Sequence, residues 1–451
     1  MLATLLAASI VTLFSQQAPI AATPSSSIPL FNGKDLTGWV NVNTSPNTWS
    51  VGKDEDGTPV IACTGHPTGV LRTAKMYENF VCEFDYSHRA PKTNAGFFVW
   101  SDAITAPGQP FTRSIEVQVM DGIDATQMID GKEQVVYTSD GDVFSIHGAR
   151  MTPDRPHPAG WERCLPSERR AKPSPAWNHY KITGDRGTLK LELNGKEISG
   201  ASNISPRKGY LCLESEGGEV WFRNLNITEL PAVTPALLPE MIATADEGFR
   251  SLFNGRDLTG WKHDAETAKH WTIDDWTLRF DGKGDHLWSE ESFGDMELIV
   301  DWKWTGEAQG ITQRPKFAPD GSELKDANGK AITVETAERD SGIYLRGNDK
   351  SQVNIWSWPA GSGEVYGYRT DGSMPAEVRA ACTPKMNADK KVGEWNRFKI
   401  RMVGDVLNVW ENGQHVIVDA NLPGVPAKGP IALQSHHSGI DFGNIYVREV
   451  K

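Results

Sequence analysis

The chain has 451 residues, which is too long for one ordinary hydrophobic core and predicts two or three domains. Its net charge of −12 at pH 7, with only short basic runs, excludes a protein that binds nucleic acid by charge. After the first residues no stretch is apolar enough to cross a membrane, so a helical membrane protein is excluded as well.

The chain begins with an apolar run from Leu2 to Phe14, followed by small residues at Ala18 and Ala22. This pattern predicts a secretory signal peptide over residues 1–22, although the usual positive residues before the apolar run are missing. We therefore expect an exported protein that is secreted, periplasmic or held at the cell surface.

A ten-residue segment occurs twice. "LFNGKDLTGW" (Leu30–Trp39) returns as "LFNGRDLTGW" (Leu252–Trp261) and is called the repeated decapeptide below. "AWNHYKI" and "EWNRFKI", and later "FRNLNI" and "FGNIYV", follow in the same order at an offset of about 220 residues. The sequence thus predicts two copies of one domain, 28–230 and 249–451, joined by a proline-containing linker over 231–248.

Within each copy the pattern is that of β-strands. Leu189, Leu191 and Leu193 alternate with polar residues, and the strand then turns at Asn194-Gly195, a favoured hairpin turn. The second copy repeats this arrangement and also carries a polar insertion, roughly Glu307–Arg339, expected to form a long loop. Many strands without helical periodicity predict an all-β fold, most economically two jelly-roll β-sandwiches.

The five cysteines cannot all pair within the chain, and the absence of a Cys-x-x-Cys motif argues against a structural zinc site. One or two disulfides among the first four cysteines and buried free thiols are both open. The residues concerned are Cys63, Cys82, Cys164, Cys212 and Cys382.

The repeated decapeptide, "NAGFFVW" (Asn94–Trp100), "IEVQVMD" and, in the second copy, "GPIALQSHHSG" resemble the 3-keto-disaccharide hydrolase domain family. The resemblance covers nearly everything after the leader. It implies two tandem concanavalin A-like jelly rolls, export, and carbohydrate as the partner, most directly a 3-keto-glycoside.

The strand around "SIEVQVMDG" places Glu116 and Gln118 on one face, opposite an apolar face. With the resemblance, this pair is a candidate catalytic site, and a solvated outer face is the alternative. His147 is the histidine of the first copy best suited to join it as a base or ligand, and a surface-loop position is its alternative. In the second copy Gln352 and Asn354 take these places; without the carboxylate we expect this copy to be catalytically reduced and to bind substrate.

A later strand differs between the copies in the same way. The first copy has Glu214 and Glu216, while the second has Gln434 and His436, the version that the family usually carries. The two glutamates could bind a divalent cation such as Ca²⁺ or Mn²⁺, or form a solvated strand face. Gln434 and His436 are expected to bind substrate.

Aromatic side chains offer apolar faces with polar edges, which suit sugar rings. Trp100 and Trp161 are the candidates in the first copy, and core packing is the alternative for each. Arg346 could orient a hydroxyl or carboxylate of the substrate, or form an ion pair on the surface. Further candidates in the second copy are Tyr344, Trp356 and Trp358.

The family's chemistry implies a reaction. A ketone at C3 of a sugar acidifies the hydrogen at C2, so a base can remove it while the C1 oxygen leaves, and water then adds to give net hydrolysis. Glu116 is the expected base. A tandem lectin-like protein without catalysis is the alternative, since neither copy keeps the full polar set, and a structural module of a cell-surface complex is a weaker one. A two-carboxylate glycosidase using Glu116 with Glu214 or Glu216 fits the residues but not the resemblance. The oligomeric state is left open.

Overall fold

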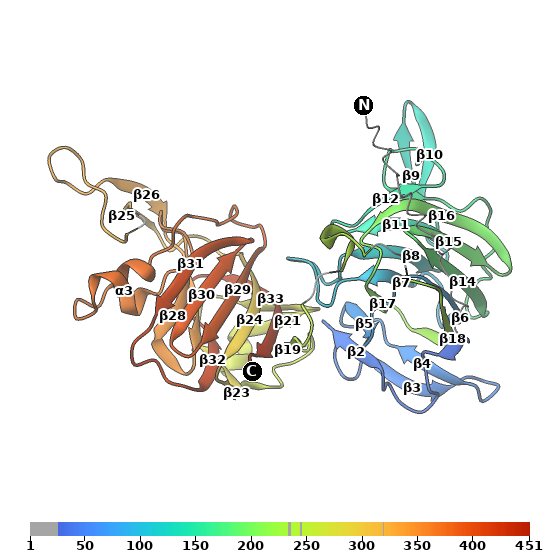
Figure 1. The fold of residues 1–451 in the computed structure, drawn as a ribbon, viewed down its shortest axis with the longest axis horizontal. Coiled ribbons are helices and arrows are strands. Elements are labelled where there is room, and N and C mark those ends of the chain that lie inside the picture. The colour runs from blue at the N-terminus through green and yellow to red at the C-terminus, as the bar shows by residue number, and fades with distance from the viewer. Residues whose placement is uncertain (1–25, 233–235, 244–245, 319) are drawn as a thin grey trace, which may run out of the picture.

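The chain folds into two β-sandwiches in tandem, one from each half of the sequence (Figure 1). The computed structural model describes residues 26–232, 236–243, 246–318 and 320–451, so the predicted signal peptide lies outside the described residues. The predicted fold class, all-β with two tandem jelly rolls, is confirmed. No helix within these ranges is long and apolar enough to span a bilayer.

The first sandwich consists of a nine-stranded and a seven-stranded antiparallel sheet. The nine-stranded sheet contains β1 (Ile28–Pro29), β3 (Trp49–Lys53), β4 (Pro59–Cys63), β6 (Phe80–His88), β12 (Arg150–Pro153), β14 (Asn178–Asp185), β15 (Thr188–Leu193), β16 (Lys196–Ser205) and β18 (Val220–Glu229). The seven-stranded sheet contains β2 (Trp39–Val42), β5 (Gly69–Thr73), β7 (Asn94–Ser101), β8 (Ser114–Met120), β11 (Asp140–Ile146), β13 (Arg163–Cys164) and β17 (Tyr210–Ser215).

The second sandwich pairs an eight-stranded with a five-stranded sheet. The eight-stranded sheet contains β19 (Arg250–Ser251), β21 (Trp271–Asp274), β22 (Thr277–Phe280), β24 (Met296–Trp304), β29 (Asn396–Val403), β30 (Val406–Glu411), β31 (Gln414–Asn421) and β33 (Ile440–Glu449). The five-stranded sheet contains β20 (Trp261–Lys262), β23 (Leu287–Phe293), β27 (Asp340–Leu345), β28 (Asn348–Trp356) and β32 (Gly429–Leu433).

The remaining elements of the described residues are two hairpins and four short helices. The first copy carries β9 (Ala125–Ile129) and β10 (Lys132–Tyr137), and the insertion of the second copy forms β25 (Ile311–Pro315) and β26 (Thr333–Ala337). The insertion, expected as a loop, thus contains a two-stranded ribbon that extends away from its sandwich (Figure 1). The helices are η1 (Pro239–Met241), α1 (Thr267–His270), α2 (Tyr366–Arg369) and α3 (Ala376–Ala381).

Alternation along the strands builds each core. The three leucines of β15 are fully buried, and the hairpin that follows turns through Asn194 and Gly195 at φ of 48° and 82°, a region these two residue types tolerate. All five cysteines are buried free thiols. The sequence left this choice open, and in the described structure no disulfide constrains either sandwich.

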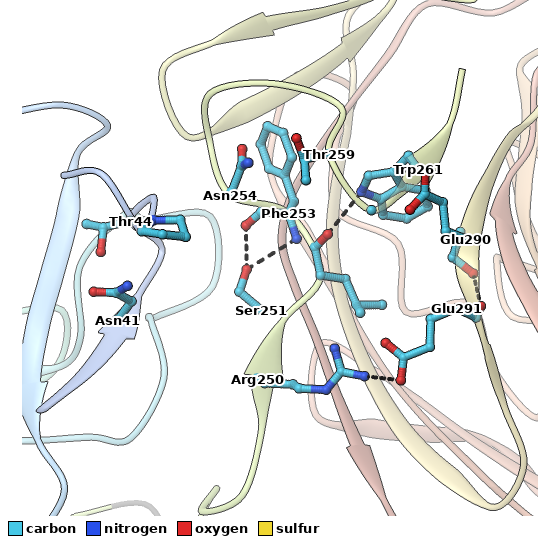
Figure 2. Close-up of a pocket in the computed structure, with 14 residues that line it drawn as sticks. Asn41, Thr44, Arg250, Ser251, Phe253, Asn254, Thr259, Trp261, Glu290 and Glu291 are labelled. Atoms are coloured by element: carbon cyan, nitrogen blue, oxygen red, sulfur yellow. Dashed lines mark hydrogen bonds and ion pairs between the residues drawn. The ribbon is translucent and has the colours of Figure 1, made fainter. Parts of the chain in front are cut away.

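The repeated decapeptide builds the same local network in both copies. The Trp39 indole donates to the Leu30 carbonyl at 2.9 Å, and Trp261 donates to Leu252 at 3.0 Å (Figure 2). Between them an asparagine side chain accepts two backbone N–H groups, at 2.8 and 3.0 Å from Asn32 and again at 2.8 and 3.0 Å from Asn254. The decapeptide is therefore a self-contained turn closed by a buried tryptophan.

A buried carboxylate joins the two sandwiches. Asp301 on β24 is fully buried, and it accepts hydrogen bonds from Arg397, from Asn444 and from the backbone N–H of Gly108 in the first copy. Asn444 also donates to two backbone carbonyls of the same first-copy loop. The loop between β7 and β8 is thus fixed against the eight-stranded sheet.

The turn network predicts a measurable stability contribution. Asn32→Ala and Asn254→Ala each remove the acceptor of two backbone hydrogen bonds, and each should lower the free energy of unfolding by about 1 kcal/mol. Urea denaturation checks this. Lys34→Arg, the one natural difference between the two decapeptides, serves as a neutral control, and an unchanged midpoint in both alanine variants would contradict the prediction.

Candidate functional site

The strand register aligns the polar residues of the two copies. Gln118 on β8 lies opposite Gly96, and Asn354 on β28 lies opposite Gly342. On the next strand Leu213 pairs with Phe97 and Leu433 with Ile343. Four pairs of positions are therefore equivalent: Glu116 and Gln352, Gln118 and Asn354, Glu214 and Gln434, Glu216 and His436.

In the first copy two carboxyl groups share one buried spot. An oxygen of Glu116 and an oxygen of Glu214 both lie 2.8 Å from the point where a Cβ on Gly96 would stand, so the two carboxyl groups converge over this glycine. Glu116 is 6% exposed and Glu214 is 1% exposed. Burial, and then the charge of the neighbouring glutamates, raises the pKa of both carboxyl groups well above the usual range. The buried environment therefore favours the protonated form of both carboxyl groups over the charged form.

The second copy covers the face that carries this pair. Phe98 lies directly opposite Glu116, and Val70 lies opposite Glu214, so all four share one face of the seven-stranded sheet. Phe98 and Val70 belong to a buried cluster that includes Phe249, Ile299 and Tyr446 of the second copy. The second copy therefore packs against the face of the sheet that carries the carboxyl pair.

Gln118 is engaged by its own copy. Its amide donates to Asn94 at 2.9 Å, and its carbonyl accepts from Arg163 at 2.9 Å. Arg163 in turn pairs with Asp142 at 2.6 Å and lies 3.9 Å over the ring of Phe144. The predicted amide is thus part of a closed internal network.

Other first-copy candidates lie apart from the carboxyl pair. His147 follows β11 beyond the residue paired with Glu116, and it lines a cavity of about 230 Å³ with Asp102 and Arg113. Burial lowers the pKa of His147. Trp100 is a fully buried core residue whose indole donates to the Glu78 carbonyl, whereas Trp161 is 41% exposed and stacks on His157. The structure does not bring these three to Glu116.

In the second copy the equivalent face opens into a cavity of about 280 Å³. Four predicted substrate-binding residues come together in it, beside aromatic side chains and one acid. The lining residues are Asp340, Gln352, Asn354, Trp356, Trp358, Tyr366, Gln434 and His436. This group of residues is called the second-copy cavity below.

The second-copy cavity contains an acid–imidazole pair. Asp340 Oδ2 lies 3.5 Å from His436 Nδ1. Burial, followed by the charge of Glu338, raises the pKa of Asp340 to about 7. In the first copy the equivalent residues are Asn94 and Glu216, which form a hydrogen bond. A carboxyl group poised near neutral pH beside an imidazole is suited to proton transfer.

Amides take the place of the two buried carboxyl groups. Gln352 donates to the Gln434 side-chain carbonyl at 2.5 Å, and Gln434 donates to the Tyr344 hydroxyl at 2.9 Å. Two amides can pair in this way because each has both a donor and an acceptor. Two carboxylates have only acceptors, so one of them must be protonated before they can pair. The floor of the cavity is therefore uncharged and its amides are oriented.

The aromatic wall differs from the expected sugar platform. Trp356 and Trp358 stack with ring centroids 4.0 Å apart. The Arg314 guanidinium lies over the Trp358 ring, with its Cζ 3.9 Å from the ring centroid. Both faces of Trp358 are occupied, so it presents its edge to the cavity. Tyr366 is 45% exposed, lines the cavity and meets Trp356 in a T-shaped contact.

Arg346 is not part of the cavity. It is 2% exposed, and its guanidinium donates to the carbonyls of Gly294, Gly404 and Pro426 and to Asp295. Its contacts stabilise loops of the second sandwich. Among the described residues no three His, Cys, Asp or Glu side chains gather as metal ligands. A divalent ion at Glu214 and Glu216 therefore stays a prediction.

Sequence reasoning missed Asp340 and Tyr366. Asp340 stands two residues before Gly342, as Asn94 stands before Gly96, so the comparison of the copies that singled out Glu116 contained this change as well. Tyr366 lies on a short helix, outside the strands that correspond between the two copies. A larger cavity of about 420 Å³ between the copies is lined mainly by the second decapeptide and its neighbours (Figure 2). It contains Arg250 paired with Glu291, but none of the predicted site residues.

The buried carboxyl pair predicts a pH-dependent stability difference. Because the pKa of Glu214 is raised in the folded protein, the folded state binds more protons than the unfolded state at pH values above the ordinary pKa of a glutamate. The free energy of unfolding therefore falls as the pH rises. Glu214→Gln should raise the melting temperature at about pH 8 and leave it unchanged at about pH 4. The reverse exchange, Gln434→Glu, is the matched control and should destabilise the protein only at the higher pH. Equal effects at both pH values would rule out the protonated pair.

Comparison with solved structures finds several proteins that match about one copy each. A predicted glycosyl hydrolase from Parabacteroides distasonis ATCC 8503 is 23% identical, with a TM-score of 0.35 over 46% of this chain and 94% of the other. The carbohydrate-binding module CBM66 from Bacillus subtilis is 12% identical, with a TM-score of 0.25 over 42% and 94%. A Bacillus licheniformis beta-glucanase is 11% identical, with a TM-score of 0.27 over 46% and 99%. A search of curated proteins finds no match.

The family comparison is more extensive. A model of the 3-keto-alpha-glucoside-1,2-lyase-like domain matches residues 26–228 and again residues 248–448. These two ranges correspond to the two sandwiches. The chain therefore belongs to the 3-keto-alpha-glucoside-1,2-lyase-like domain family, with two tandem copies.

Proposed function

We propose that this protein is exported and cleaves 3-keto-α-glucosides by elimination and hydration, with the second-copy cavity as its catalytic site. The family supports the substrate class. The observation that supports the cavity is the pair of Asp340 and His436, which adjoins aromatic and amide side chains. Export rests on the apolar leader of the sequence.

The reaction requires one proton to leave carbon and one to reach oxygen. The Asp340 carboxylate accepts the hydrogen at C2, which the neighbouring C3 ketone makes acidic. The electron pair of that C–H bond forms the C1–C2 double bond, and the C1–O bond breaks. The His436 imidazolium donates a proton to the departing oxygen, and a water molecule then adds across the double bond.

The amides support the same step. Negative charge develops on the C3 oxygen when the C2 proton is removed, and amide N–H groups held in place stabilise such charge without reorganising. Asn354 is 4% exposed and lines the cavity. Its side-chain amide is the proposed donor, while Gln352 and Gln434 orient the cavity floor.

The first copy offers the competing assignment. Glu116 is the base that the sequence predicts, but its face is covered by the second copy and its neighbour Gln118 is held by Arg163. A divalent ion at Glu214 and Glu216 belongs to that assignment. Assays with and without added Ca²⁺ or Mn²⁺ test whether the ion contributes.

The test compares the two copies directly with a p-nitrophenyl 3-keto-α-glucoside. Asp340→Asn should lower kcat/KM by about 100-fold or more, because a positioned base contributes at least that much. The acidic side of the wild-type kcat/KM profile against pH should have its inflection at about 7, where Asp340 ionises. Release of p-nitrophenol measures both effects.

Glu116→Gln is the matched variant in the first copy and should leave turnover within about twofold. Loss of turnover in Glu116→Gln alone would move the catalytic site to the first copy. Binding of glycosides with no turnover by the wild type would favour the lectin-like alternative.

A further inference from the structure

The insertion of the second copy places an ion pair beside the second-copy cavity. Arg314 on β25 donates to both oxygens of Glu338, which follows β26, at 2.5 and 2.8 Å. Their side chains are 30% and 15% exposed. A two-pronged contact of this kind fixes both side chains more firmly than a single surface ion pair.

The same pair holds the aromatic wall. Arg314 covers one face of Trp358 and Trp356 covers the other. The Trp358 indole donates to Glu338 at 3.3 Å. Arginine, both tryptophans and the glutamate thus form one rigid group, in which Trp356 and Trp358 line the cavity.

The pair also acts on Asp340 with opposite charges. Burial raises the pKa of Asp340 most, Glu338 raises it further, and Arg314 lowers it. The other ionisable groups near this carboxyl are His436, at 3.5 Å, and the adjacent Arg339, whose guanidinium donates to the Gly306 carbonyl. The hydroxyl groups of Tyr344 and Tyr366 are also nearby. The uncharged side chains Gln352, Asn354 and Gln434 complete its surroundings in the cavity.

The first copy has an asparagine where the second has Asp340, and the insertion occurs only in the second copy. The titratable residue and the charged pair that acts on it therefore occur together. We propose that Arg314 and Glu338 are positioning residues that set how readily Asp340 accepts a proton and that hold the Trp358 wall of the cavity. The inference rests on the proposed function for its catalytic meaning, but not for the behaviour of Asp340 itself.

Two substitutions that conserve size separate the charges. Glu338→Gln removes the negative charge and keeps an acceptor for Trp358. The acidic limb of the kcat/KM profile against pH, where Asp340 ionises, should therefore move to lower pH by about 0.5–1 unit. Arg314→Met keeps an apolar chain over Trp358, and the limb should move to higher pH by a similar amount. The double variant should lie near the wild type.

Glu291→Gln is the control, because Glu291 pairs with Arg250 in the cavity between the copies and not in the second-copy cavity. It should not move the limb. Arg314→Lys keeps the charge but loses the two-pronged contact, so it should keep the pH limb while changing KM. This variant also covers the case in which Arg314→Met does not fold.

A second measurement needs no substrate. In full-length protein labelled at histidine Cε1, the NMR signal of His436, assigned by its loss in His436→Gln, should report the ionisation of its neighbour Asp340. A plot of this signal against pH should have an inflection where Asp340 ionises. Glu338→Gln and Arg314→Met should move that inflection in opposite directions.

The outcomes are distinct. Opposite shifts by NMR without turnover would uphold the inference and overturn the proposed function. Turnover whose acidic limb is unmoved by either variant, or moved in the same direction by both, would overturn the inference and leave the proposed function standing.

Discussion

The Asp301 carboxylate is the interaction on which the arrangement of the two sandwiches depends. It is fully buried, and a buried charge is tolerated only when its acceptor positions are filled. Here Arg397 and Asn444 of the second copy and a backbone N–H of the first copy fill them. Because one donor comes from the other copy, separation of the sandwiches would leave this carboxylate less satisfied. The contacts of Asp301 between the copies thereby fix which face of the first copy is covered and which face of the second copy is open.

The closed and open faces carry matching residues with different charges. In the first copy Glu116 and Glu214 are desolvated together, and burial raises the pKa of both carboxyl groups. In the second copy Gln352 and Gln434 have the same size and pair through an amide. The titratable group has moved one strand away, to Asp340, where it adjoins His436 at the edge of an open cavity. One backbone arrangement thus supports a closed acidic centre in one copy and an acid–base pair in the other.

Much of the fold follows from the sequence, because duplication, period-two alternation and Asn-Gly turns are local signals. The equivalence of Glu116 with Gln352 and of Glu216 with His436 is visible in the same way, and the strand register agrees with it. Three features are not local. The covering of the first-copy face depends on docking between the copies, and Arg346 meets carbonyls far away in the chain. The layering of Trp358 between Trp356 and Arg314 depends on how the insertion folds back. Spacing along the chain does not reveal such contacts, so the sequence located the polar positions but not the copy with the open cavity.

The repeated decapeptide has a consequence for biosynthesis. Two nearly identical segments in tandem domains invite exchange, in which one sandwich takes up the opening segment of the other. In each copy the short strand before the decapeptide pairs with the last strand of its own sandwich, β1 with β18 and β19 with β33. During synthesis β18 emerges before the second decapeptide exists. The first sandwich can therefore pair with its own opening segment before the second decapeptide leaves the ribosome. The order of translation thus prevents exchange of the two segments, whereas in refolding of the whole chain both segments are present from the start.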